Sequence, residues 1–203
     1  MNGYVYHNIE EITVSISCLV IAYVMAKRHR QSPDSIYFMT AEGFFILSIS
    51  SAIHVIGHVL GEVQGLLYSS LMGYLTGFAS ILISPFVRKG SRVKKYIPLI
   101  FFVILTILFL SNSMMVDFFK TRFSLWMPTA FLSSLLAVIY LSEYLRNKKR
   151  HDGAITIGFF LIAISSAFLF FPADVRSFPW MAGHIIRPAG FLILMLGFSM
   201  RWE

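Results

Sequence analysis

The feature that most constrains this chain is a series of long apolar segments separated by short polar breaks. Segments of about 17–25 apolar residues can cross a lipid bilayer as helices. Inside a bilayer the backbone must satisfy its own hydrogen bonds, so continuous runs of this length predict helices. The 203-residue chain is 57% hydrophobic and only 13% charged, which leaves too little polar surface for a soluble helical protein. We therefore predict an all-α integral membrane bundle.

Seven such segments can be recognised, and we expect them to form one seven-helix transmembrane domain over residues 1–203. No hydrophilic stretch is long enough for a separate soluble domain. The predicted helices are Ile9–Ala26, Tyr37–Leu60, Gln64–Val87, Tyr96–Asn112, Leu125–Leu145, Ala154–Pro172 and Met181–Met200.

The basic residues predict how the bundle is oriented. Most of the 17 lysines and arginines fall in alternate breaks, within 27–30, 88–95 and 146–150, with Arg201 at the end. Cytoplasmic loops carry such an excess, so the N-terminus is expected outside and the C-terminus in the cytoplasm, in the cytoplasmic membrane of a prokaryote. The net charge of +7 then indicates contact with anionic lipid head groups and not with nucleic acid.

Three further features limit the class of protein. Cys18 is the single cysteine, which excludes an intramolecular disulfide and a cysteine-rich metal site. The N-terminus, MNGYVYHNIEEI, lacks the basic region of a signal peptide, so the first helix is expected to be retained. The last segment contains no lysine to hold retinal, which argues against a light-sensing protein.

Ionisable side chains gather near the outer ends of three predicted helices. In AIHVIGHVLGEVQGLL (residues 52–67), His54 and His58 are four residues apart and share one helix face. At 1.5 Å per residue, His58 and His184 lie roughly 3–5 Å below the outer boundary, and His54 and Arg187 roughly 9 Å below it. The first helix begins at the same boundary with His7, Glu10 and Glu11. Such groups usually face the bundle interior, so we predict an outer-leaflet site between the second and seventh segments.

One candidate ligand of this site is haem b. His58 with His184 is the depth-matched axial pair, and His54 with His184 is the alternative, because the two ligands must come from different helices. Flanking residues would meet the rest of the cofactor: Arg187 or Arg176 the propionates, and Trp180 and Phe178 the ring.

The other candidate ligand is a divalent metal ion such as zinc, bound by His54, His58 and His184 with an open position for water. Glu62, Glu10 or Glu11 would supply a fourth ligand or a general base, which would make a membrane hydrolase possible. No glutamate directly follows His54 as it would in a zincin motif. A third interpretation is structural, with histidines that only form hydrogen bonds between helices.

The segment AGHIIRPAGFLILMLG (Ala182–Gly197) opens the last helix with a Gly-His, an apolar pair and an arginine. It resembles the seven-helix sensory input regions, or membrane-associated sensor domains, of archaeal and bacterial kinases and cyclases. The resemblance implies seven helices with the N-terminus outside and a sensory role. Since no kinase or cyclase follows Glu203, we expect an input region that is truncated or that works alone or with a cytoplasmic or membrane partner protein.

Together these patterns predict a haem- or metal-binding membrane module that acts in signal sensing or electron transfer. A metal-dependent membrane hydrolase is the competing prediction, and a structural subunit or cofactor-free sensor is the third.

Overall fold

A computed structural model describes residues 3–61, 63–84, 123–170 and 177–200, and in these residues the regular secondary structure is helical. Six helices are long and apolar enough to cross a membrane, which confirms the predicted all-helical architecture. The fourth predicted segment, Tyr96–Asn112, lies outside the described residues. The helices are α1 (Gly3–Gln31), α2 (Ser35–Val59), α3 (Gln64–Ile83), α6 (Phe123–Asn147), α7 (Arg150–Phe170) and α8 (Phe178–Met200).

The first helix begins earlier than the apolar run predicts, at Gly3 and not at Ile9. His7, which precedes the predicted start, therefore lies within the helix, and like Glu10 and Glu11 it is buried in the bundle. The second helix has a defined start, because the Asp34 side chain accepts a hydrogen bond from the backbone N–H of Ile36 at 3.1 Å. This is an N-cap, which satisfies one of the free N–H groups of the first turn.

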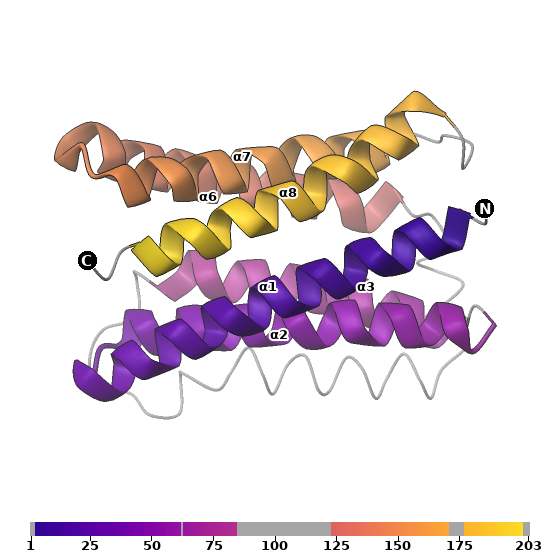
Figure 1. The fold of residues 1–203 in the computed structure, drawn as a ribbon, viewed down its shortest axis with the longest axis horizontal. Helices are drawn as coiled ribbons and strands as arrows, with labels where there is room; N and C mark the ends of the chain where they lie inside the picture. The colour runs from indigo at the N-terminus through magenta and orange to yellow at the C-terminus, as the bar shows by residue number, and fades with distance from the viewer. Residues whose placement is uncertain (1–2, 62, 85–122, 171–176, 201–203) are drawn as a thin grey trace.

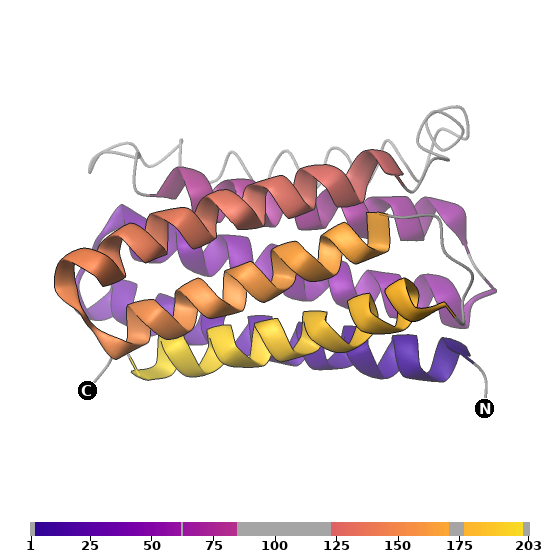
Figure 2. The same ribbon diagram turned by 90° about the horizontal axis from the view of Figure 1, so that it is seen from above.

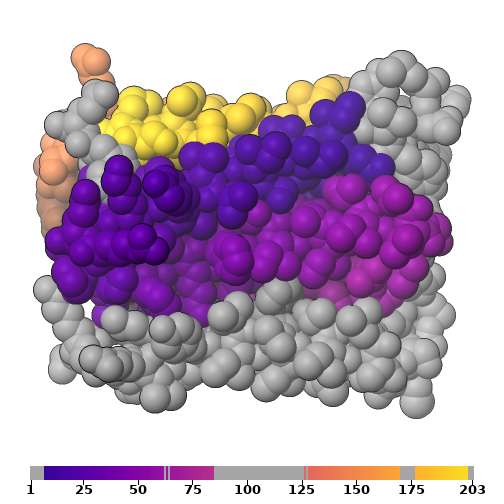
Figure 3. Space-filling model, turned by 60° about the horizontal axis from the view of Figure 1, so that its bottom comes forward, coloured from indigo at the N-terminus to yellow at the C-terminus, as the bar shows by residue number. Residues whose placement is uncertain are grey.

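The helices form two halves, one of α1, α2 and α3 and the other of α6, α7 and α8 (Figure 1). Within each half, helices adjacent in sequence pack side by side, and Figure 2 shows them running alongside one another. The halves meet where α1 packs on α8 and α3 packs on α6. Figure 3 shows α1 lying between α8 and α2 on one face of the molecule. The six described helices thus form a closed ring.

Apolar side chains cover both the inside and the outside of this ring. The core contains residues of all six helices, among them Phe44, Phe78, Leu136, Phe159 and Phe191. Large apolar side chains also project outward, including Val59 with 70% of its surface exposed and Phe178 with 76%. An apolar exterior of this kind is expected where lipid is the solvent.

Two pairs of glycines bring the helices of each half into close contact. A Cβ atom built on Gly43 of α2 would lie 2.7 Å from the carbonyl oxygen of Gly77 on α3. In the other half, a Cβ on Gly190 of α8 would lie 3.0 Å from the carbonyl oxygen of Gly158 on α7. Small residues permit this backbone-to-backbone approach in membrane helices.

The two ends of the bundle differ in their polar residues. We call the end where α1 and α8 begin and α2 ends, on the right in Figure 1, the histidine end. The opposite end, with the α1–α2 and α6–α7 turns, is the basic end. Among the described residues it carries every lysine and arginine except Arg187: Lys27, Arg28, Arg30, Arg146, Lys148, Lys149 and Arg150.

Candidate functional site

His7, in the second turn of α1, is the centre of the polar cluster at the histidine end. The centroid of its ring lies 5.0 Å from that of His54, 4.9 Å from that of His58 and 4.7 Å from that of His184. His54 and His58 lie on α2 and His184 on α8, so three helices contribute to the cluster. His7 and His54 are buried, and His58 and His184 are half-buried.

Hydrogen bonds connect three of these histidines in a row: His184, His7 and His54. Nδ1 of His7 lies 3.3 Å from Nδ1 of His184, and Nε2 of His7 lies 2.9 Å from Nε2 of His54. At the far side of the row, Nδ1 of His54 lies 2.6 Å from the hydroxyl oxygen of Ser70 on α3. Each nitrogen of His7 therefore faces a different neighbour.

Glu10, one turn after His7, joins the cluster through both carboxylate oxygens. Oε2 accepts a short hydrogen bond from His184 and lies 3.4 Å from Nδ1 of His7. Oε1 lies 3.2 Å from Nη1 of Arg187. Glu10 thus connects the histidines to an ion pair deeper in the bundle.

Arg187 of α8 is 1% exposed and lies among groups that compensate its charge. Its Nη2 donates to Oε1 of Glu11 at 2.7 Å and also to the hydroxyl of Tyr74, which in turn donates to Oε2 of Glu11 at 2.7 Å. Ser51 forms a further short hydrogen bond with Tyr74. The guanidinium stands 4.6 Å from the ring centre of Tyr74 and 5.1 Å from that of Trp126. Buried charges are retained when they are paired in this way.

The formal charges of the described cluster do not cancel. Arg187 contributes one positive charge, whereas Glu10 and Glu11 contribute two negative charges when they are ionised. The remaining charge is then −1: a proton on one of the histidines would neutralise it, and a bound divalent cation would change it to +1.

Two groups of side chains have the donor atoms and spacing to hold a metal ion. The first trio is His7, Glu10 and His184, and the second is His7, His54 and His58. Within each trio the candidate ligand atoms lie within 4.8 Å of one another. In a tetrahedral zinc site with bonds of about 2.0–2.1 Å, neighbouring donor atoms are about 3.4 Å apart. The residues present therefore fit a single ion of this size.

Most of the residues predicted for the site are brought together. His54, His58, His184 and Arg187 meet at one end, and Trp180 contacts His184 with ring centroids 4.2 Å apart. Phe178 is 76% exposed at the start of α8. Two predicted residues, Glu62 and Arg176, lie outside the described part of the chain.

The sequence interpretation did not identify the central histidine. His7 was noted only for its position in the first helix, although it contacts all three predicted histidines. The sequence feature that could have identified His7 is its spacing from Glu10: the two residues are three apart and hence on one helix face. Arg187, expected to meet haem propionates, is instead paired with the carboxylates of Glu10 and Glu11.

Comparisons with models of known protein families, with characterised proteins and with solved structures find no match for this chain. The similarity to sensory input regions therefore rests on the short segment that begins the last helix. What the protein does must be inferred from the geometry of the histidine end.

Proposed function

We propose that this chain is a membrane-embedded module that binds a divalent transition-metal ion, such as zinc, at the histidine end. The observation that carries the proposal is the convergence of His7, Glu10 and His184, from two helices distant in sequence, within 4.8 Å of one another. Imidazole nitrogen and carboxylate oxygen are ligands that zinc takes in proteins. Ionisable groups inside a membrane are costly to bury and mark functional sites.

The contacts of His7 favour a single ion over haem b. The ring of His7 contacts both His58 and His184, the depth-matched pair of axial ligands. A haem between those two histidines would require His7 to leave both contacts. A single metal ion requires less rearrangement, because its ligands are already close together and only the hydrogen bond between His184 and Glu10 must open.

The position of the site between the two halves favours a sensory role. His7 and Glu10 belong to the half that contains α1, and His184 belongs to the half that contains α8. An ion that binds one arrangement of the halves more tightly than another shifts the population toward the first. We place the histidine end outside the cell, because the described basic residues other than Arg187 are at the opposite end. The signal would then pass to a partner at the basic end.

A metal-dependent membrane hydrolase is the second candidate, and the ligand types of the first trio favour it. Two imidazoles, a carboxylate and a water form the ligand set of several catalytic zinc sites. Turnover of lipid ester or amide substrates by zinc-loaded protein, lost in Glu10→Gln, would support this candidate. Ion binding without turnover would support the sensor.

Metal content tests the proposal directly. The full chain is extracted in mild detergent without chelators, analysed for bound metal and haem, and titrated with zinc. We expect one high-affinity ion per chain, lost in His184→Ala and retained in His29→Ala, a matched histidine at the basic end. A protein that neither contains nor takes up a metal would contradict the proposal, and a Soret absorption band would favour haem.

The sensory role needs a second measurement. Spin labels on Tyr23→Cys in α1 and Leu141→Cys in α6, two exposed positions in different halves, report the separation of the halves. Replacing the buried Cys18 with serine gives a background without reactive thiols. We expect zinc to narrow or shift the distance distribution. An unchanged distribution at full zinc occupancy would contradict sensing through movement of the halves.

A further inference from the structure

The two trios that share His7 are not equivalent ion sites. We infer that the ion binds to Nδ1 of His7, Nδ1 of His184 and Oε2 of Glu10, and that His54 and Ser70 are positioning residues that keep the proton of His7 on Nε2. This inference rests on the proposed metal-binding function and specifies which atoms perform it.

The hydroxyl group of Ser70 has a single proton, and its two neighbours determine to which of them Ser70 donates. Its oxygen lies 2.7 Å from the carbonyl oxygen of Leu67, which can only accept, so Ser70 donates there. Ser70 must then accept from Nδ1 of His54 at 2.6 Å. A neutral His54 with its proton on Nδ1 has a lone pair on Nε2.

The tautomer of His54 determines which atom donates in its hydrogen bond with His7. Because Nε2 of neutral His54 accepts, Nε2 of His7 at 2.9 Å must donate. When His7 is neutral as well, its Nδ1 carries a lone pair, and this atom faces Nδ1 of His184 and Oε2 of Glu10. A ligating histidine typically donates its other ring N–H to an acceptor, as His7 does here.

The distances between donor atoms also distinguish the trios. In the first trio, Nδ1 of His7 is 3.3 Å from Nδ1 of His184 and 3.4 Å from Oε2 of Glu10, close to the donor spacing of a tetrahedral site of about 3.4 Å. The hydrogen bond from His184 to Glu10 is shorter, so for both atoms to bind one ion this bond must open and the His184 proton must lie on Nε2. In the second trio, His7 and His54 share one proton across 2.9 Å.

The ion pair deeper in the bundle supports the same assignment. Arg187 contacts Oε1 of Glu10, and this leaves Oε2 directed at the histidines. Arg187 is itself held by Glu11 and Tyr74. The first trio therefore presents a carboxylate oriented by a neighbouring cation, and the second presents imidazoles alone.

X-ray absorption spectroscopy of the zinc-loaded full chain tests the inference without any substitution. We expect two imidazoles and at least one oxygen in the coordination shell. Three imidazoles would place the ion in the second trio and overturn the inference while the proposed function stands. A wild-type chain that takes up no zinc would overturn both.

Variants then test the positioning residues. Ser70→Ala and His54→Ala should weaken zinc affinity by about 10- to 100-fold, the usual effect of removing a group that orients a ligand. His54→Gln keeps an oxygen that can accept from His7 and should restore most of the affinity. His58→Ala, which removes a ligand of the second trio only, should change affinity less than about threefold.

The last test measures the tautomer of His7, which a change in packing alone would not alter. In ¹⁵N-histidine NMR spectra, the His7 resonances, assigned with His7→Gln, should show the proton on Nε2 in the wild type and a mixture of tautomers in Ser70→Ala. Loss of zinc binding in His58→Ala with binding retained in His184→Ala would overturn the assignment. An unchanged tautomer and affinity in Ser70→Ala would overturn the positioning role.

Discussion

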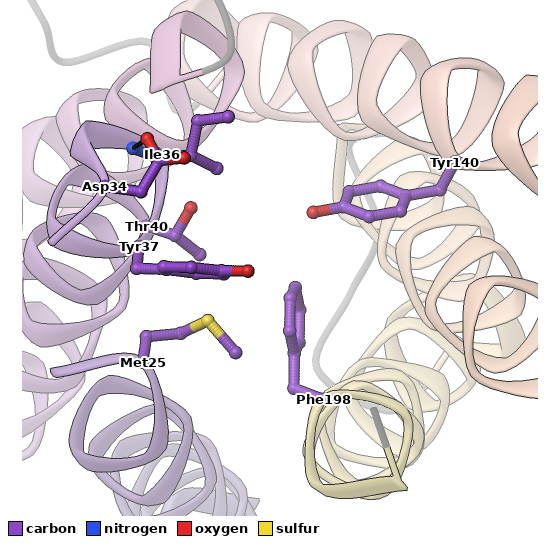
Figure 4. A pocket seen from close by; sticks show the side chains of 7 residues that line it. All are labelled: Met25, Asp34, Ile36, Tyr37, Thr40, Tyr140 and Phe198. Carbon is purple, nitrogen blue, oxygen red and sulfur yellow. Dashed lines mark hydrogen bonds between the residues drawn. The ribbon is translucent and has the colours of Figure 1, made fainter. Parts of the chain in front are cut away.

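The two ends of the bundle join the same two halves in opposite ways. At the histidine end, Arg187 of α8 forms ion pairs with Glu10 and Glu11 of α1, so charged side chains connect the halves. At the basic end the halves are separated by a cavity of about 90 Å³. Figure 4 shows the side chains of Tyr37, Tyr140 and Phe198 directed toward this space from helices of both halves.

The difference shows that burial, and not the number of charges, determines what a charged residue contributes. Seven of the eight described lysines and arginines are at the basic end, where Arg146 and Glu143 form an exposed pair with 73% and 39% of their side chains accessible. Such pairs contribute about 0–1 kcal/mol. The one lysine or arginine that the structure describes at the histidine end, Arg187, is buried, and its loss would leave carboxylates without compensation.

The largest effect is expected from Arg187→Leu. Removing one member of a buried ion pair costs about 3–5 kcal/mol, because the remaining charges stay buried without a partner. Thermal unfolding in detergent measures the loss. Arg146→Leu, the matched change at the basic end, should cost less than about 1 kcal/mol, and equal losses would remove the distinction between the ends.

Acidification should weaken metal binding at the histidine end. A protonated imidazole has no lone pair for a metal, so protons compete with zinc at low pH. Zinc affinity should fall more than about tenfold between about pH 7.5 and about pH 5.5. Isothermal titration at several pH values checks this. An affinity that stays constant over this range would mean that histidines are not the ligands.

A smaller effect is expected where packing is changed instead of charge. Gly190→Val would place a side chain against the backbone of Gly158, and overpacking of this kind costs about 1–3 kcal/mol. Met25→Phe at the basic end enlarges a side chain that lines the cavity and should cost less than about 1.5 kcal/mol. Equal losses in thermal stability would indicate that the cavity has no room for the larger ring.

The orientation of the ends can be tested with no expected change in stability. In a background of Cys18→Ser, a cysteine at exposed Leu60 marks the histidine end and one at exposed Pro33 marks the basic end. A membrane-impermeant thiol reagent added outside intact cells should label position 60 and leave position 33 unlabelled. The reverse pattern would place the histidine end in the cytoplasm. The basic stretch 88–95, on which the sequence argument also relied, lies outside the described residues.

The sequence predicted the helices because an apolar run in lipid has few alternatives. It set the start of α1 too late, at Ile9, since His7 interrupts the apolar pattern although it is buried in the bundle. In a membrane protein, polar residues at a helix end can therefore belong to the helix when a buried partner is present.

Depth along a helix could be calculated from the sequence, but rotation about its axis could not. The rise per residue correctly placed His54, His58, His184 and Arg187 at one end. Which face of α1 points inward depends on its packing between α2 and α8, and the sequence does not contain that information directly. This is why His7 was not recognised as the central residue, and why the partners of Arg187 were not identified.

The contact between Trp180 and His184 gives the protein a fluorescent reporter of its own. The two ring centroids are 4.2 Å apart, and Trp180 is one of three tryptophans in the chain. A paramagnetic ion such as Cu²⁺ or Co²⁺ at the first trio would quench the emission of this indole, whereas diamagnetic zinc would leave it bright. Occupancy could then be followed optically in an intact membrane, with Trp180→Phe as the reference for the emission of the other two tryptophans.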